Sequence, residues 1–164
     1  IEIFNIIVKK GYDWDLFIIG EGIENKNLKK LAEKYNLESN INFTGQIPKN
    51  DIYNYLKVSD VFISLYDRQN LTNTLWEAMS MGKCILTRSE FDINKTVVKH
   101  GDNGYLYPID DLNRIAERLI KISKNKSLLD RIGYNAKKTV EKLLPSWDER
   151  VNNEYISIKN IIDN

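Results

Sequence analysis

The 164-residue sequence predicts an α/β domain, in which a Rossmann-like parallel sheet carries helices on both faces. Two observations support this class. Between residues 14 and 108, short apolar runs alternate with stretches of helical period, a pattern typical of right-handed βαβ units. From Asp110 onward the pattern is helical only, which predicts a helical C-terminal extension. The chain shows no linker or repeat, so we expect residues 1–164 to form one domain.

Five short apolar runs bounded by glycine or polar residues are the predicted strands. The first, WDLFIIG, suits a strand that is buried on both faces of the sheet. The last, GYLYP, follows a turn formed by HGDNG. The predicted strands cover residues 14–20, 41–45, 61–65, 84–87 and 104–108.

Amphipathic stretches predict the helices. Asn50 or Asp51 can cap the third of them, and Gly82 ends the fourth. Ser146 and Glu149 form the capping box of the last one. The first helix begins in mid-pattern, as expected of a chain cut from a longer one. Helical patterns cover residues 3–7, 27–35, 50–58, 72–82, 110–123, 127–144 and 146–162.

The amino-acid composition indicates which binding partners and which cellular compartment to expect for this chain. The 24 Lys and Arg against 23 Asp and Glu leave a net charge of +1, which favours neither nucleic acid nor an anionic membrane. Cys84 is the one cysteine, which excludes a disulfide framework and favours the cytoplasm. No apolar run approaches the roughly 20 residues of a transmembrane segment. With His100 as the one histidine, no metal site is indicated.

Ligands of open parallel sheets bind at the carboxyl ends of the strands. Four such ends can be identified, in residues 20–22, 45–49, 66–73 and 87–92. The third leads into a helix whose first turn holds Thr72, Asn73 and Thr74, and its N–H groups suit an anion such as a diphosphate. Glu77, one turn further on, is well placed to accept hydrogen bonds from a ribose; the alternative is an ordinary exposed glutamate.

The segment SLYDRQNLTNTLWEAMSMG, residues 64–82, resembles the signature of retaining family 4 glycosyltransferases of the GT-B fold. Its helix matches the family form Leu-x-Glu-Ala-Met-x-x-Gly. LFIIGEG, INFTGQIP, GDNGYLY and SWDERVNNEYISI resemble further family motifs in the same order along the chain. The resemblance covers nearly the whole chain and implies the C-terminal, donor-binding half of such an enzyme.

The resemblance also implies roles for two carboxylates. The glutamate that matches Glu77 contacts the donor's ribose, and an acidic residue eight positions earlier contacts the transferred sugar. In this sequence that spacing falls on Gln69, whereas counting forward from Ser64 gives Asp67 and requires a two-residue insertion in the loop. Asp67 and Gln69 therefore compete for the catalytic position, and a role of Asp67 as a turn cap is a further alternative.

The same resemblance implies a donor-binding set. The diphosphate lies against the loop and helix start, the base lies against the GQIP loop with the backbone of Ile47, and glycines permit close approach. The implied residues are Gly20, Gly22, Gly45, Ile47, Asn70, Leu71, Thr72, Asn73 and Thr74. Gly20-x-Gly22 is not a dinucleotide fingerprint, because position 25 is asparagine, which argues against a nicotinamide cofactor.

The implied activity is that of a longer protein. We expect a first strand with an Arg/Lys loop, and an acceptor-binding domain, to precede Ile1. The full protein then transfers a hexose with retention from a nucleoside diphosphate sugar, taken to be a UDP-sugar, to a glycan or lipid, without a cofactor. We expect it in the cytoplasm, with attachment to the inner membrane face through the missing domain as one option. The alternative is a non-catalytic nucleotide-sugar-binding or regulatory module.

Overall fold

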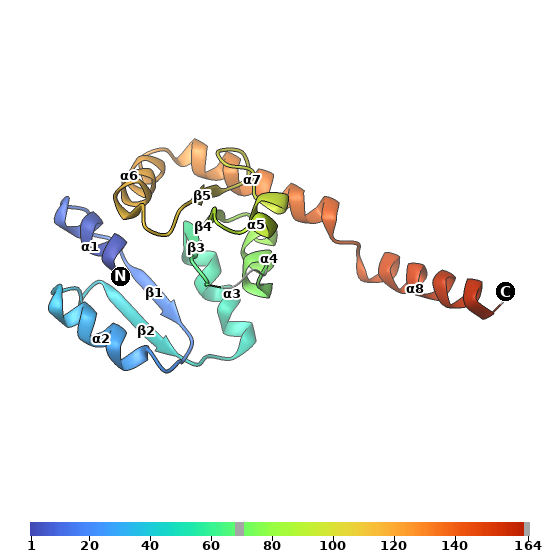
Figure 1. The fold of residues 1–164 in the computed structure, drawn as a ribbon, viewed down its shortest axis with the longest axis horizontal. Coiled ribbons are helices and arrows are strands. Elements are labelled where there is room, and N and C mark those ends of the chain that lie inside the picture. The colour runs from blue at the N-terminus through green and yellow to red at the C-terminus, as the bar shows by residue number, and fades with distance from the viewer. Residues whose placement is uncertain (68–70, 163–164) are drawn as a thin grey trace.

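The computed structural model describes residues 1–67 and 71–162, and these contain five strands and eight helices (Figure 1). All strand pairs are parallel, which confirms the predicted α/β class. The described strands form two sheets and not one continuous sheet. One sheet consists of β1 (Leu16–Ile19) and β2 (Ile41–Gly45), and the other of β3 (Val61–Ser64), β4 (Cys84–Arg88) and β5 (Tyr105–Tyr107), in that order.

The helices follow the predicted pattern with two differences. A helix after β4 was not predicted, and Pro48, not Asn50 or Asp51, is the N-cap of α3. Proline fixes its own φ and needs no N–H partner, so the helix starts directly after it. The helices are α1 (Glu2–Lys9), α2 (Asn25–Lys34), α3 (Lys49–Val58), α4 (Asn73–Ser80), α5 (Asp92–Val97), α6 (Leu112–Ser123), α7 (Lys126–Leu143) and α8 (Trp147–Ile162).

The three-stranded sheet lies between two layers of helices. Its central strand β4 is buried almost throughout, and successive side chains point to opposite faces. Cys84 and Leu86 join a cluster with residues of α1, α6 and α7, whereas Ile85 joins a cluster with residues of α3, α4 and α7. Helices on both faces were predicted, and this arrangement confirms them.

Strand β1 is less buried than the sequence predicts, and β3 is exposed to a similar extent. Their apolar side chains suit full burial, but Ile19 and Ile63 are each 38% exposed. Within the described part of the chain, β1 pairs with β2 alone and β3 with β4 alone, so each keeps one edge without a partner strand. The expectation that β1 is buried on both faces is therefore wrong.

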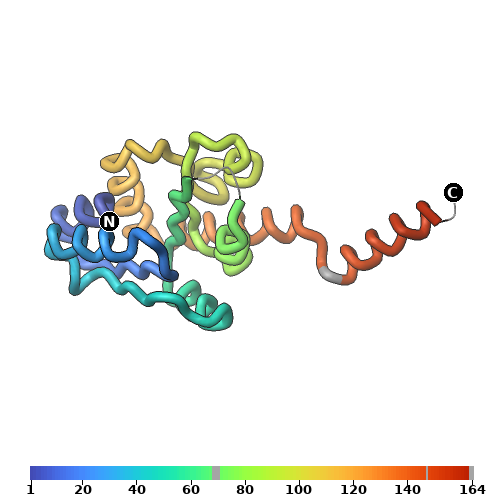
Figure 2. Tube along the Cα trace, turned by 60° about the horizontal axis from the view of Figure 1, so that its bottom comes forward, coloured from blue at the N-terminus to red at the C-terminus, as the bar shows by residue number. Residues whose placement is uncertain are grey.

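Helix α8 extends away from the rest of the molecule in both views (Figures 1 and 2). The predicted capping box at its start is confirmed: the Ser146 N–H donates to Glu149 at 2.8 Å, and the Glu149 N–H donates to the Ser146 hydroxyl at 3.2 Å. None of the described helices combines the length and apolar character needed to cross a membrane.

Cys84 lies in the core at 1% exposure, and burial raises the pKa of its thiol to about 12. Because the thiolate is the reactive form, we expect Ellman's reagent to label the native protein at pH 8 far more slowly than a free thiol. The same protein in guanidinium chloride should react within minutes with one equivalent, which provides the control. Stoichiometric labelling of the native protein at that rate would contradict the buried position.

Candidate functional site

The amino end of α4 has a side-chain N-cap and free backbone N–H groups. Thr72 is the N-cap, and its hydroxyl accepts a hydrogen bond from the Leu75 N–H at 3.3 Å and lies 3.0 Å from the Thr74 hydroxyl. Helical geometry leaves the N–H groups of Asn73 and Thr74 without an intrahelical acceptor. Both residues are exposed, whereas the Leu71 side chain packs against the core. This helix start can therefore present N–H groups to an anion.

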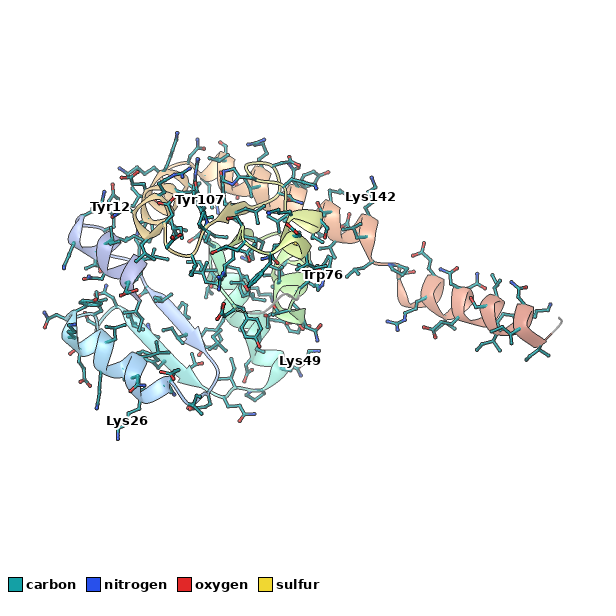
Figure 3. The ribbon with its side chains drawn as sticks, in the orientation of Figure 1. Tyr12, Lys26, Lys49, Trp76, Tyr107 and Lys142 are labelled. Atoms are coloured by element: carbon teal, nitrogen blue, oxygen red, sulfur yellow. The ribbon has the colours of Figure 1, made fainter. Side chains whose placement is uncertain are left out.

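Glu77 lies one turn further along α4, between two of the predicted ligand loops. Its side chain is 18% exposed, and one carboxylate oxygen lies 3.7 Å from the ammonium of Lys49 at the start of α3. Figure 3 labels Lys49 there and labels Trp76, the neighbour of Glu77, on α4. Since Lys49 itself is 74% exposed, the pair is a weak surface interaction that a ligand can displace. The pair brings the loop after β2 next to Glu77.

The carboxyl ends of β1 and β2 meet at two glycines. The Gly20 N–H donates to the Gly45 carbonyl at 2.9 Å, and both residues have positive φ, of 117° and 67°. Glycine adopts this backbone readily, so an end-of-strand turn accounts for both positions. Gly22 has neither positive φ nor a crowded Cβ position. Ile47, half-buried, follows in the loop that leads to Lys49.

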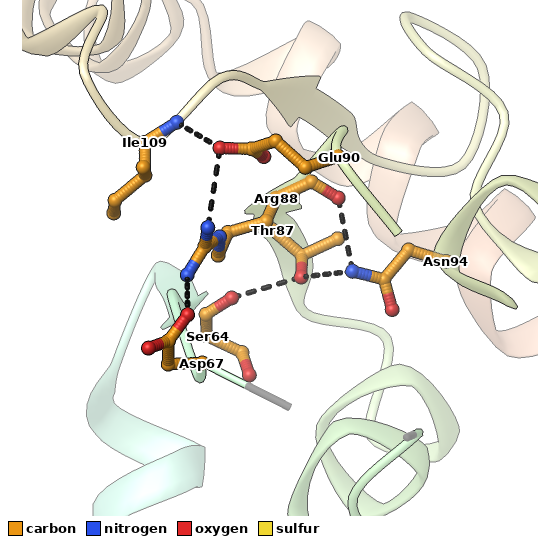
Figure 4. Close-up of polar contacts among 7 residues, drawn as sticks. All are labelled: Ser64, Asp67, Thr87, Arg88, Glu90, Asn94 and Ile109. Carbon is orange, nitrogen blue, oxygen red and sulfur yellow. Dashed lines mark hydrogen bonds and ion pairs between the residues drawn. The ribbon is translucent and has the colours of Figure 1, made fainter. Parts of the chain in front are cut away.

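A polar frame ties the carboxyl ends of β3 and β4 together (Figure 4). The Thr87 hydroxyl donates to the Ser64 carbonyl at 2.8 Å. The Asn94 amide of α5 donates to the Thr87 hydroxyl at 3.3 Å and to the Arg88 carbonyl at 2.9 Å. Thr87 and Asn94 are 3% and 5% exposed, so these bonds are shielded from water. The frame fixes the point at which the loop to α4 begins.

Asp67 lies in that loop and pairs with Arg88. Its Oδ1 atom accepts from Nη1 of Arg88 at 2.6 Å, while Nη2 lies 3.3 Å from Oε1 of Glu90. Glu90 also accepts from the Ile109 N–H at 2.7 Å. Burial raises the pKa of Glu90, but the hydrogen bonds from the Ile109 N–H and Arg88 outweigh it, and the pKa lies below its usual value. Glu90 is therefore ionised at neutral pH.

Comparison with known proteins identifies the family of this chain. The family model for glycosyl transferases group 1 matches residues 1–139. The chain belongs to this family. Two relatives are an uncharacterized glycosyltransferase of Methanocaldococcus jannaschii, 33% identical over 144 residues, and the capsular polysaccharide biosynthesis glycosyltransferase CapM of Staphylococcus aureus, 30% identical over 152 residues. The matches cover 87% and 91% of this chain but 36% and 40% of those proteins.

Solved structures share the fold of this group 1 chain. A sucrose-phosphate synthase from Thermosynechococcus elongatus has a TM-score of 0.82 at 18% identity, over 99% of this chain and 42% of that one. HepE of Anabaena, in complex with UDP, has a TM-score of 0.79 at 17% identity, over 95% of this chain and 44% of that one. The C-terminal domain of a group 1 protein, LpcC of Francisella tularensis, has a TM-score of 0.73 at 19% identity. The match covers 87% of this chain and 75% of that one.

The structure groups the predicted residues of this group 1 chain into three parts. Gly20 is bonded to Gly45, Thr72 caps the helix that carries Glu77, and Asp67 pairs with Arg88. Gln69 and Asn70 lie outside the described residues. The described residues contain no group of three or more His, Cys, Asp or Glu side chains that could hold a metal ion.

Sequence reasoning missed three charged residues at this edge: Lys49, Arg88 and Glu90. Each lies in a loop that was predicted to follow a strand, at residues 45–49 and 87–92. The available signal was a charged residue within four positions after a predicted strand end. Their partners Glu77 and Asp67 lie 28 and 21 residues away from Lys49 and Arg88, so periodicity could not pair them.

Proposed function

We propose that this chain is the donor-binding C-terminal domain of a retaining glycosyltransferase of family 4, which transfers a sugar from a nucleoside diphosphate sugar to a glycan or lipid. One observation carries the proposal: the partly buried Glu77 lies one turn behind the exposed start of α4 and faces the loop of Ile47 and Lys49. An anion site and a carboxylate that can accept from a ribose thus occupy one helix. The UDP complex of HepE, a structure of the same fold, supports a UDP-sugar as donor.

In this proposal each part of the edge has a task. The N–H groups of Asn73 and Thr74 receive the diphosphate, and the positive end of α4 stabilises the charge that develops as it leaves. Glu77 exchanges its weak pair with Lys49 for hydrogen bonds from the ribose hydroxyls. The backbone of Ile47 reads the edge of the base. Asp67 or Gln69 contacts the transferred sugar.

We further propose that the segment before Ile1 supplies a strand between β1 and β3, a basic loop for the diphosphate, and the acceptor domain. The unpaired edges of the two strands and the 38% exposure of Ile19 and Ile63 support an additional strand there. The chain also spans only 36% and 40% of two relatives. We place the full protein in the cytoplasm, with the acceptor bound by the other domain.

Calorimetric titration of the complete polypeptide tests this function. We expect saturable binding of a nucleoside diphosphate, UDP first among UDP, GDP and ADP, and no saturable binding of NAD. Binding of NAD without binding of any nucleoside diphosphate would overturn the proposal in favour of a dinucleotide-binding domain.

Turnover separates an enzyme from a regulatory module of the same fold. The complete enzyme should release UDP from a UDP-sugar in the presence of acceptor, and proton NMR of the product should show the anomeric configuration of the donor. Nucleotide binding without release of UDP over a panel of acceptors would favour the regulatory module. An inverted product would contradict retention.

A further inference from the structure

Arg88 has the least exposed side chain of the charged residues described at this edge. It is 12% exposed, whereas the Asp67 side chain that it contacts is 90% exposed. Among the described residues, Asp67 makes its one ion pair with this guanidinium, at 2.6 Å (Figure 4). An exposed aspartate on a loop samples several rotamers, and a short bond to a fixed, permanently charged partner selects one of them.

The guanidinium is fixed from the sides that do not face Asp67. Nη2 lies 3.3 Å from Glu90, which is itself bonded to the Ile109 N–H at 2.7 Å. The guanidinium carbon lies 4.8 Å from the centre of the Phe91 ring, and Asn94 donates to the Arg88 carbonyl at 2.9 Å. Three segments therefore set the position of Arg88: β4, α5 with the residues before it, and the loop after β5. The position of Asp67 depends on Arg88, and not the reverse.

From this arrangement we propose that Arg88 is a positioning residue, which holds the Asp67 carboxylate and the start of the loop to α4 in place for the sugar of the donor. The proposal rests on the proposed function, because it takes Asp67 as the group that contacts the sugar. It also favours Asp67 over Gln69 for that contact, since the frame of β4 and α5 orients a carboxylate at residue 67.

A direct bond from Arg88 to the diphosphate is the alternative role for this cation. Two carboxylates, Asp67 and Glu90, already surround the guanidinium, so a diphosphate would have to displace the 2.6 Å pair. Nε is buried and lacks a hydrogen-bond partner among the described residues, so a diphosphate could reach it only if the surrounding side chains moved. The contacts therefore favour positioning over ligand binding.

A double-mutant cycle in the complete enzyme tests the proposal, with Arg88→Gln, Asp67→Asn and the pair combined. We expect Arg88→Gln to lower kcat by about 10- to 100-fold, the effect of a misplaced catalytic group, with donor KM changed less than about threefold. Because both single variants disable the same group, the positioned Asp67 carboxylate, the kcat of the double variant should be no lower than that of Asp67→Asn alone. Arg88→Lys should recover part of kcat. Arg131→Gln, at an exposed arginine of α7, is the control.

The outcomes separate the possible roles. If Arg88→Gln raises the donor KM more than about tenfold, leaves kcat unchanged and acts additively with Asp67→Asn, Arg88 binds the diphosphate and the proposal is overturned. A nucleotide-free crystal structure of Arg88→Gln provides a measurement that needs no activity. We expect its Asp67 carboxylate to move by more than about 1 Å. An unmoved carboxylate overturns the proposal, whether or not the wild-type enzyme binds a nucleotide. Absence of nucleotide binding by the wild-type enzyme is a different result, which contradicts the proposed function.

Discussion

Gly133→Ala should destabilise the domain by about 3 kcal/mol, although alanine is the better helix former. Gly133 lies in α7, where it packs against Gly82 at the end of α4. A Cβ at position 133 would overlap the Gly82 carbonyl oxygen and come within 2.8 Å of its carbonyl carbon. The Gly82 carbonyl is part of the backbone and cannot change rotamer as a side chain can. The two helices must therefore move apart. The helix propensity gain of about 1 kcal/mol is too small to compensate.

Urea unfolding followed by circular dichroism measures this effect. Gly82→Ala is a useful comparison: its Cβ would lie 3.5 Å from the nearest atom, but its φ of 68° costs alanine about 1–2 kcal/mol. Gly22→Ala is the matched control, because nothing lies within 4 Å of its Cβ position and its φ is ordinary. A Gly133→Ala protein as stable as the wild type would show that α4 and α7 do not pack as described.

Glu77→Ala should weaken donor binding by about 10- to 100-fold, the loss of one or two hydrogen bonds to a charged acceptor. Glu77→Gln should have a smaller effect, because the amide oxygen still accepts from one hydroxyl. The fold should tolerate both changes, since the pair with Lys49 at 3.7 Å is partly exposed and contributes at most about 1 kcal/mol.

Calorimetry with the complete polypeptide gives the dissociation constants. Glu141→Gln on α7 is the matched control, because Glu141 also pairs with a lysine, Lys138 at 2.8 Å, but lies outside the site. An unchanged dissociation constant in Glu77→Ala would remove the assigned ribose contact. A 2′-deoxynucleotide that binds the wild type and Glu77→Ala equally well would support the assignment further.

Local patterns in the sequence predicted much of this fold. The strand at residues 41–45, the stop of α4 at Gly82 and the capping box of Ser146 and Glu149 all lie where their local chemistry places them. These features depend on neighbours a few residues apart, which a sequence displays directly. The family signature of residues 64–82 is local in the same way, and the family match confirms its coarser part, that the chain belongs to the glycosyl transferases group 1.

Features that depend on distant neighbours were not predictable. The apolar side chains of Ile19 and Ile63 suit a continuous sheet, but strand pairing depends on which segments are adjacent in space. Helix α5 has six residues, too few to show a helical period. The pairs Lys49 with Glu77 and Arg88 with Asp67 join segments more than 20 residues apart, so only the fold reveals them.

A crystal structure of the complete polypeptide with UDP tests the central claim most directly. The account predicts that the diphosphate contacts the N–H groups of Asn73 and Thr74, that the ribose hydroxyls donate to Glu77, and that the uracil lies against the loop of Ile47. Lys49 should have left Glu77. A nucleotide bound elsewhere, with the Lys49–Glu77 pair intact, would contradict the account.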